Sequence, residues 1–530
     1  MKKLLPLIIL TTCLFIGCKE KESKRKKVSK RNYSITKENA YNDLFLDSLE
    51  VAGFISKNVI PDSISRRIIS FYNTRNYEFA WFSSDGLSEQ AMGFSSLLNF
   101  TGDTSARRKK MKKTMDDLMG FDRLKISESD KSIINTELLL TESLIGYTLT
   151  NYEKGFVKRK EVERFIPFKK QDPIFLADSL LNKKHKDDKY FSAINERYKL
   201  LSEQLKKYVG MTKSNQWIAI EGDAKLFKEG NSSPQIAAMK KDLFLTGDLA
   251  QNDTSQLFDE RLKNGIKNFQ IRFGFTADGK ITPDLLKRMK VTPLERVKQL
   301  LINMNRMRWL PQQPEGHLIV VNTPAFILHM FHRENTVFSM PVVVGKEGHN
   351  TTLFSDMLTT IVFSPYWNIP RSIVKNEIVP AMAKNGNYIA AHDMEITGQN
   401  NGLPVVRQKP GPKNSLGKVK FLFPNIFNIY FHDTPAKSLF DQDVRAFSHG
   451  CIRLGDPEKM ANYLLKNNSK WTSEKINEAM NSGDEQFVAL KTPVPVFITY
   501  YTAWVDENGK LNFRDDIYAH DKEVAGKMFW

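Results

Sequence analysis

The sequence predicts an α+β protein of several domains: a helical N-terminal half, a small three-helix domain and a mostly-β C-terminal domain. Three observations predict this class. The 530 residues suffice for two to four domains of about 100–200 residues each. Apolar residues recur at helical spacing as far as Met307 and occur in short β-rich runs after Glu315. Hydrophobic residues make up 41% of the chain, so each domain can bury a core.

The chain is strongly basic, with a formal net charge of +18. Such a balance favours an anionic partner, which can be nucleic acid, an acidic membrane surface or an acidic polymer. The sequence has no zinc-finger spacing, no aromatic RNA-binding signature and no heptad repeat with a basic region, so we expect no nucleic-acid partner. A basic surface that only maintains solubility is the alternative explanation.

The N-terminus predicts export. Two lysines precede an apolar run over residues 4–17, which is shorter than the ~20 residues needed to cross a bilayer and fits a secretory signal. Its end, Leu14-Phe15-Ile16-Gly17-Cys18, resembles the lipobox of bacterial lipoproteins, in which the cysteine is acylated. The resemblance makes residues 1–18 a lipoprotein signal peptide. An ordinary signal peptide that is cleaved a few residues later is the alternative.

Two segments without a catalytic pattern follow. Residues 19–40 begin with a run of charged residues that lacks an apolar period, which predicts a flexible basic tether. Residues 41–230 carry apolar residues at helical spacing, for example Ile64 and Ile68, and no cluster of catalytic residue types. We expect a helical scaffold domain there.

A compact helical unit is predicted over residues 234–290. Leu262, Ile266, Phe269 and Phe273 step by four, three and four residues, which places them on one face of a helix. An Asp-Gly turn follows, and a threonine cap and a proline begin a last helix. This string is similar to the small three-helix peptidoglycan-binding domain of cell-wall enzymes, and the binding role is implied by that resemblance. A further amphipathic helix connects the unit to the C-terminal half, over residues 291–314.

The C-terminal half is predicted to be mostly β. Short runs rich in β-branched and aromatic residues, separated by turns, indicate a domain over residues 315–505 and a C-terminal β extension over residues 506–530. Residues 371–412 interrupt this pattern with a helical run and several glycine turns. Long insertions of this kind are usually functional or disordered, and we expect this one to form a lid over the site.

Cys451 is the only cysteine after Cys18. In an oxidising compartment it has no internal disulfide partner, so it is either inert or reactive. A free thiol with a pKa of about 8.5 is only a few per cent ionised at pH 7, so a nucleophilic cysteine needs a base, and His432 and His449 are the nearby candidates. A buried cysteine that acts as a small hydrophobe is one alternative. A zinc site made of the three side chains is another.

The residues around this cysteine favour catalysis. Residues 427–432 alternate apolar and polar side chains, which places His432 at a strand end on a polar face. Ser448, His449 and Gly450 directly precede the thiol. Glycine lets the backbone turn so that neighbouring amides converge on one point, where they could hold the oxyanion of a tetrahedral intermediate.

His432 followed by Ser448-His449-Gly450-Cys451-Ile452-Arg453 resembles the signature of the L,D-transpeptidases, which cross-link peptidoglycan with a cysteine nucleophile. The likeness includes Lys418-Val419-Lys420-Phe421-Leu422-Phe423-Pro424-Asn425 and Tyr366-Trp367-Asn368-Ile369-Pro370, and the layout resembles the large multidomain branch of that family. The resemblance assigns Cys451 as nucleophile and His432 as its general base, oriented by a backbone carbonyl. It assigns His449 as a residue that orients the site.

The resemblance also assigns the remaining site residues. The amides around Gly450 and Cys451 would donate to the oxyanion. Ser448 and Trp367 would contact substrate, Trp367 as a wall of the site; a plain core position is the alternative for Trp367. Arg453 would bind a substrate carboxylate, for which its planar fork is suited, although smaller family members often carry asparagine at this position.

The implied reaction has two steps. The thiol attacks a diamino acid carbonyl in a donor stem peptide, releases D-alanine and leaves a thioester, which the side-chain amine of an acceptor stem resolves. The implied partners are these two peptidoglycan stem peptides and a membrane, reached through a lipid on Cys18; no cofactor or metal is expected, and no protein partner is indicated. The expected place is the periplasm, as a lipoprotein of the outer rather than the inner membrane. An L,D-carboxypeptidase, a lipoprotein-anchoring transpeptidase and a non-catalytic peptidoglycan-binding lipoprotein are the alternatives.

Overall fold

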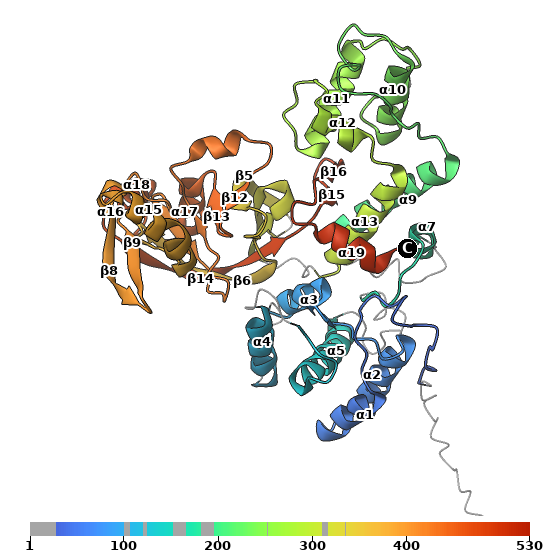
Figure 1. Ribbon diagram of the computed structural model, residues 1–530, viewed down its shortest axis with the longest axis horizontal. Coiled ribbons are helices and arrows are strands. Elements are labelled where there is room, and N and C mark those ends of the chain that lie inside the picture. Colours follow the sequence, from blue (N-terminus) through green and yellow to red (C-terminus); the bar gives the residue numbers. More distant parts are fainter. Residues whose placement is uncertain are drawn as a thin grey trace, which may run out of the picture.

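The computed structural model describes residues 28–99, 106–119, 125–151, 166–181, 196–251, 253–309, 316–333 and 335–530. The predicted signal peptide, the predicted acylation of Cys18 and the first part of the tether lie outside these residues and stay predictions. The rest of the predicted tether, residues 28–40, is not a free tether: Ile35 is fully buried and Ala40 pairs with Lys169, so apolar packing fixes this segment on the N-terminal lobe. The described chain is an α+β protein of three lobes, which meet around helices α13 (Pro293–Met307) and α19 (His520–Met528), as Figure 1 shows. Of the helices described, none has the length and apolar character needed to cross a membrane.

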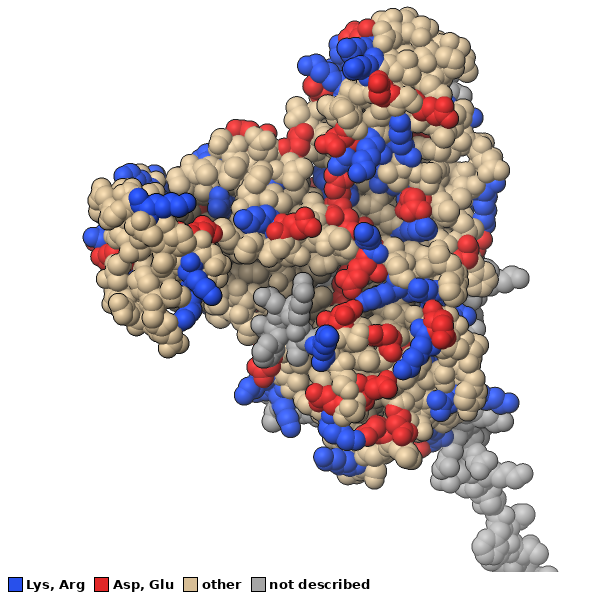
Figure 2. All heavy atoms as spheres, in the orientation of Figure 1, with Lys and Arg blue, Asp and Glu red and all other residues tan. Residues whose placement is uncertain are grey.

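Basic and acidic side chains are interspersed on the face of the molecule drawn in Figure 2. Lys and Arg occur on all three lobes there, next to Asp and Glu. On this face, therefore, the net positive charge does not gather into one patch of the kind that a nucleic-acid backbone would need.

The N-terminal lobe is helical, in agreement with its apolar period. Its buried core includes Phe71, Tyr72, Trp81 and Phe94. A short hairpin, with Asp85 and Gly86 near its turn, lies between its second and third helices. The elements of this lobe are α1 (Ser48–Lys57), α2 (Asp62–Thr74), β1 (Phe82–Ser83), β2 (Gly86–Leu87), α3 (Glu89–Asn99), α4 (Ala106–Met119), α5 (Lys131–Asn151), α7 (Pro173–Leu181) and α9 (Glu196–Ser214).

The three-helix unit forms the upper lobe in Figure 1. It consists of α10 (Pro234–Thr246), α11 (Glu260–Phe273) and α12 (Pro283–Met289). The four apolar residues predicted to share one face of α11 are all buried. The Thr282 hydroxyl accepts a hydrogen bond from the Leu285 amide at 3.1 Å, so the predicted cap begins α12.

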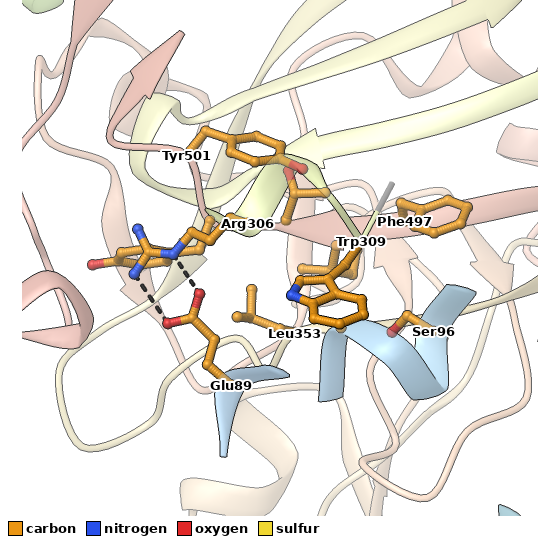
Figure 3. Close-up of a pocket in the computed structure, with 11 residues that line it drawn as sticks. Glu89, Ser96, Arg306, Trp309, Leu353, Phe497 and Tyr501 are labelled. Atoms are coloured by element: carbon orange, nitrogen blue, oxygen red, sulfur yellow. Dashed lines mark hydrogen bonds and ion pairs between the residues drawn. The ribbon is translucent and has the colours of Figure 1, made fainter. Parts of the chain in front are cut away.

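A buried ion cluster joins the lobes. Arg306, near the end of α13, pairs with Glu89 of α3 and, at 2.5 Å, with Asp521 of α19. Figure 3 shows Glu89 and Arg306 facing each other beside Trp309. The cavity at this junction has a volume of only ≈ 60 Å³, whereas ligand sites usually hold about 300 Å³ or more. It is a packing junction between lobes and not a substrate site.

The mostly-β domain is built on a nine-stranded sheet in the order β12-β5-β13-β11-β10-β6-β14-β3-β4. An additional pairing of β4 with β5 closes the sheet into a barrel, with β12 outside the ring, which removes most free strand edges. Two helices and a buried apolar core accompany the barrel. The elements are β3 (His317–Asn322), β4 (Ile327–His332), β5 (Asn335–Gly345), β6 (Phe354–Phe363), β10 (Val419–Leu422), β11 (Phe431–His432), β12 (Ala446–Ser448), β13 (Ile452–Leu454), α17 (Pro457–Leu465), α18 (Ser473–Asn481) and β14 (Gln486–Thr499).

The predicted lid, residues 371–412, folds as a small subdomain at the far end of the barrel lobe (Figure 1). It has its own sheet, in the order β7-β9-β8, and its own apolar core, which includes Ile373, Val374 and Ile378. Because β7 belongs to that sheet, the subdomain begins four residues earlier than predicted. Its elements are β7 (Trp367–Asn368), α14 (Arg371–Ile373), the π-helix η2 (Val374–Ile378), α15 (Val379–Lys384), α16 (Tyr388–Ala391), β8 (Met394–Asn400) and β9 (Leu403–Gln408).

The C-terminal segment is not the purely β extension that the sequence predicts. A hairpin of β15 (Ala503–Val505) and β16 (Leu511–Phe513) is followed by the helix α19. Val524 and Met528, four residues apart, are both buried in the core that the N-terminal helices share. Because these two residues are at helical spacing, burying both of them requires a helix here and not the predicted strand.

Candidate active site

Two short parallel strands bring the predicted nucleophile and base together. His432 of β11 pairs with Arg453 of β13, and Phe431 pairs with Ile452. The Ile452 amide donates to the Tyr430 carbonyl at 3.1 Å, which extends the contact by one residue. Phe431 and Ile452 are fully buried in the barrel core, and side chains alternate along a strand. The opposite face, called the reactive face below, therefore carries Tyr430, His432, Cys451 and Arg453.

The run predicted as one strand over residues 427–432 pairs only at its last two residues. The Asn425 side chain donates to the Ile429 carbonyl at 2.7 Å and accepts from its amide at 3.1 Å, which folds residues 425–429 into a turn. Asn428 within this turn has a φ of +52°, outside the β region. The shortened strand still ends at His432, so the predicted placement of this histidine at a strand end is correct.

His432 is buried and neutral. Its Nδ1 lies 2.5 Å from the Asp433 carbonyl oxygen, and a carbonyl only accepts, so Nδ1 carries the hydrogen and Nε2 has a free lone pair. This is the backbone carbonyl expected to orient the ring. Burial, and after it the charge of Arg453, lower the pKa of His432 to about 3, while the Asp433 and Leu416 backbones oppose this. At neutral pH this imidazole is therefore uncharged.

Cys451 is half-buried and is the free cysteine of the described residues. Its thiol donates to the Asn428 carbonyl at 3.6 Å. Burial raises the pKa of Cys451 to about 11, against the lowering effects of Tyr430 and of the Arg453 charge. The directions of both shifts leave the thiol and the imidazole uncharged at neutral pH.

Tyr430 is a site residue that the sequence analysis did not select. Its hydroxyl lies near the Cys451 thiol and Trp367, both of which affect its pKa, and its ring centroid lies 5.8 Å from that of His432. Burial and the neighbouring thiol raise the pKa of Tyr430, so the hydroxyl keeps its proton. The alternation of residues 428, 430 and 432 on one face was the signal that could have identified it. Trp367 of β7 is half-buried beside this hydroxyl, and its role as a substrate wall stays a prediction.

The turn before Cys451 is tied together by Ser448. The Ser448 hydroxyl donates to the Cys451 carbonyl at 2.5 Å and accepts from the Gly450 amide at 3.1 Å, and the residue is buried. Gly450 has a φ of +112°, which a side chain would strain. The Ser448 hydroxyl is thus used inside the turn, away from the predicted substrate contact. Of the two predicted oxyanion donors, the Gly450 amide is occupied and the Cys451 amide has no acceptor among the described residues.

His449 contacts the inserted subdomain and the loop after β5. Its Nε2 lies 3.0 Å from Glu377 Oε1 of the π-helix η2, and its ring centroid lies 4.9 Å from that of His349. Burial lowers the pKa of His449, while Glu377 opposes this. The side chain therefore links the cysteine turn to the inserted subdomain, and whether it also orients the site during catalysis stays a prediction.

Arg453 has unused hydrogen-bonding capacity on the reactive face. Its Nε is buried and has no hydrogen-bond partner among the described residues. Burial lowers the pKa of Arg453, and the neighbouring Cys451 opposes this. An unpaired guanidinium nitrogen beside a nucleophile is suited to an anionic group of a bound substrate.

The described residues contain no group of three or more His, Cys, Asp or Glu side chains arranged to hold a metal ion. Of the three proposed zinc ligands, Cys451 and His432 lie on the reactive face, whereas His449 is directed to Glu377. The geometry of these side chains suits nucleophilic catalysis by a thiol with a neutral base.

Comparison with known proteins gives a match in each half of the chain. Residues 316–496 match the family described as the L,D-transpeptidase catalytic domain (YkuD), and residues 66–205 match a family described as a scaffold domain. A Haemophilus influenzae protein named "Putative L,D-transpeptidase" is 31% identical over 243 residues, which are 43% of this chain. The match covers 49% of that protein, so the chain spans about half the length of the curated relative.

Similar solved structures carry the same family name. An L,D-transpeptidase from Mycobacterium smegmatis is 14% identical with a TM-score of 0.20, over 35% of this chain and 58% of that chain. An L,D-transpeptidase from Stackebrandtia nassauensis is 13% identical with a TM-score of 0.22, over 53% of this chain and 97% of that chain.

Proposed function

Since residues 316–496 match the L,D-transpeptidase catalytic domain family, we propose that the protein cross-links peptidoglycan stem peptides through a thioester on Cys451. One observation supports the proposal: the paired strands β11 and β13 place the Cys451 thiol, the His432 imidazole and the Arg453 guanidinium, whose Nε has no partner among the described residues, on one face. The Cys451 amide, which has no acceptor among the described residues, lies beside the sulfur that would attack.

The first half-reaction forms the thioester. The Cys451 sulfur attacks the diamino acid carbonyl of the donor stem while its proton passes to His432 Nε2, and the carbonyl oxygen becomes an oxyanion near the Cys451 amide. When the tetrahedral intermediate collapses, the bond to D-alanine breaks. His432 returns the proton to the leaving amine, which departs as free D-alanine.

The second half-reaction forms the cross-link. The side-chain amine of an acceptor stem attacks the thioester carbonyl, and His432 accepts a proton from that amine. Collapse of the second intermediate breaks the carbon–sulfur bond, and the sulfur takes up the proton from His432. The products are a new amide bond between two stems and the neutral thiol of the resting site.

Arg453 is proposed to bind the carboxylate of the donor stem, and we expect the Arg453→Met variant to test this. With a donor that ends in D-alanine carboxylate, kcat/KM should fall about 10- to 100-fold, the value of a charge-assisted hydrogen bond. With the same donor ending in a neutral amide, the loss should be less than about threefold. Arg453→Lys keeps the charge without the planar fork and should lie in between. An equal loss of kcat/KM on both donors would show that Arg453 does not bind the carboxylate.

Muropeptide analysis tests the proposed function as a whole. Purified cell wall is incubated with the wild-type chain or with Cys451→Ala, and the released muropeptides are separated. We expect direct cross-links between two diamino acids to rise with the wild type and not with the variant. A rise only in stems shortened by D-alanine would make the protein a carboxypeptidase, and no Cys451-dependent change would overturn the enzymatic proposal.

A further inference from the structure

The C-terminal segment beyond the barrel strands reaches the loop that supports the cysteine turn. Tyr518, between β16 and α19, is buried. Its hydroxyl donates to the Gly345 carbonyl at 2.6 Å and accepts from the Thr351 amide at 3.3 Å. Gly345 is the last residue of β5, and Thr351 lies in the following loop, three residues before β6 begins at Phe354. One tyrosine hydroxyl, from outside the matched catalytic domain, therefore bridges residues 345 and 351.

The same loop holds the peptide bond before the nucleophile. The Thr351 hydroxyl donates to the Gly450 carbonyl at 2.9 Å and accepts from the Gly345 amide at 2.9 Å. Thr351 is fully buried, so water does not compete for these bonds. A Cβ on Gly345 would lie 1.9 Å from the His349 carbonyl oxygen, so the loop backbone packs directly on this glycine.

Fixing the Gly450 carbonyl fixes the Cys451 amide. The peptide unit is planar, and the described chain has no cis peptide bonds, so the N–H of Cys451 points opposite to the carbonyl of Gly450. The carbonyl is directed to Thr351, which aims the amide to the other side of the turn. This amide is the oxyanion donor of the proposed reaction, and the Gly450 amide is already bound to Ser448.

Tyr518 is itself anchored to the junction of the lobes. Its amide donates to the Tyr500 hydroxyl at 2.9 Å, and the two rings stack with centroids 5.7 Å apart. The Tyr500 hydroxyl donates to Asp516 at 2.7 Å. The Arg306 guanidinium lies 5.1 Å from the Tyr500 ring centroid, at the ion cluster that Figure 3 shows. The tyrosine hydroxyl therefore meets the loop from a rigid support.

We propose that Tyr518 and Thr351 are positioning residues of the reaction: they hold the Gly450–Cys451 peptide so that the Cys451 amide faces the developing oxyanion. The inference rests on the proposed function and deepens it, because the amide matters only if an acyl intermediate forms. Neither residue touches the reacting atoms. The C-terminal segment thereby becomes part of the catalytic machinery, although it lies beyond the matched domain.

Two reactions of the Cys451 thiol distinguish a misplaced Cys451 amide from a general disruption of the site. p-Nitrophenyl acetate acylates Cys451 through a tetrahedral oxyanion: the sulfur–acyl bond forms, the ester bond breaks, p-nitrophenolate leaves and the thiol proton goes to His432. Iodoacetamide alkylates the same sulfur with loss of iodide and forms no oxyanion. A misplaced amide slows only the first reaction, whereas a disrupted site changes both.

The primary test uses Tyr518→Phe in the full chain. Removing a direct oxyanion donor costs about 10²–10³-fold, and we expect loss of its support to slow acylation of Cys451 about 10-fold or more. The lower acylation rate should appear in kcat with KM unchanged, because the hydrogen bond from the Cys451 amide to the oxyanion is made only in the transition state. Alkylation of Cys451, followed by mass spectrometry of its peptide, should stay within about twofold. Tyr501→Phe is the matched control, since this buried tyrosine of the same segment makes no hydrogen bond to the loop.

A second pair of variants tests the other residue. Thr351→Val removes the hydroxyl at equal size and should give the same selective loss, whereas Thr351→Ser keeps the hydroxyl and should restore acylation. Acylation by Tyr518→Phe at the wild-type rate, or equal slowing of acylation and alkylation, would overturn the inference. Failure of the proposed function is seen separately, as wild-type protein that acylates with the ester but forms no cross-links in cell wall.

Discussion

We expect the His432→Gln variant to lose about 10²–10⁴-fold in kcat/KM for acyl transfer, the range that general-base catalysis contributes. The reason lies in the resting state of the site. With a pKa of about 11, the Cys451 thiol is protonated at neutral pH, and with a pKa of about 3, His432 is unprotonated. Attack therefore needs a base that takes the proton as the sulfur–carbon bond forms. Glutamine fills a similar space and can donate to the Asp433 carbonyl, but it has no basic nitrogen.

The measurement is steady-state acyl transfer from a donor stem peptide, with His332→Gln as the control. His332 is an exposed histidine on β4 and should tolerate the change within about twofold. The Tm of both variants should show that the fold persists. If His432→Gln keeps more than about a tenth of the wild-type kcat/KM, another group accepts the proton, and the role assigned to this histidine is wrong.

The local sequence pattern predicts that His432 and Cys451 belong to one site, but it does not predict the geometry of that site. Alternation along residues 427–432 places His432 on a polar face, and the cysteine sits beside a glycine turn. The parallel pairing of β11 with β13 depends on assembly of the whole barrel, in which β13 also pairs with β5 and so joins residues more than a hundred positions apart. Tyr430 could be identified as a site residue only from this pairing, which places it against the thiol.

Long-range contacts also explain what the sequence did not reveal about the surroundings of the site. Nothing local in Ser448-His449-Gly450 indicates that the histidine turns toward Glu377 or that the serine closes the turn on itself. The contact of Tyr518 with the loop at Thr351 joins residues separated by 167 positions. Helices in the N-terminal half were predictable because their period is local. Positions of single polar side chains were not, because they depend on which segments pack together.

The contact between His449 and Glu377 gives the inserted subdomain a physical link to the site. Glu377 lies on a π-helix, a geometry that often marks functional positions in helices. The bond joins the residue before Gly450 to a segment with its own apolar core, so subdomain and cysteine turn are held in one arrangement. The cysteine turn is thus contacted by the inserted subdomain through Glu377 and by the loop that Tyr518 holds through Thr351.

The pH dependence of alkylation distinguishes a neutral thiol–imidazole pair from an ion pair. At a pKa of about 11, only about one Cys451 in 10⁴ is a thiolate at pH 7, and the thiolate is the form that reacts. The rate with neutral iodoacetamide should therefore rise about tenfold per pH unit from pH 7 and level off near pH 11. Mass spectrometry of the Cys451 peptide measures this rate without interference from other thiols.

Two variants make the distinction sharp. His432→Gln should leave the alkylation profile in place, because an uncharged imidazole does not stabilise a thiolate. Arg453→Met should move the rise to higher pH, because the charge of Arg453 lowers the pKa of the thiol and its removal disfavours the thiolate. A rate that is already maximal at pH 7 and collapses in His432→Gln would show a preformed thiolate–imidazolium pair. The proton would then leave the sulfur before substrate binds, contrary to the burial that raises its pKa.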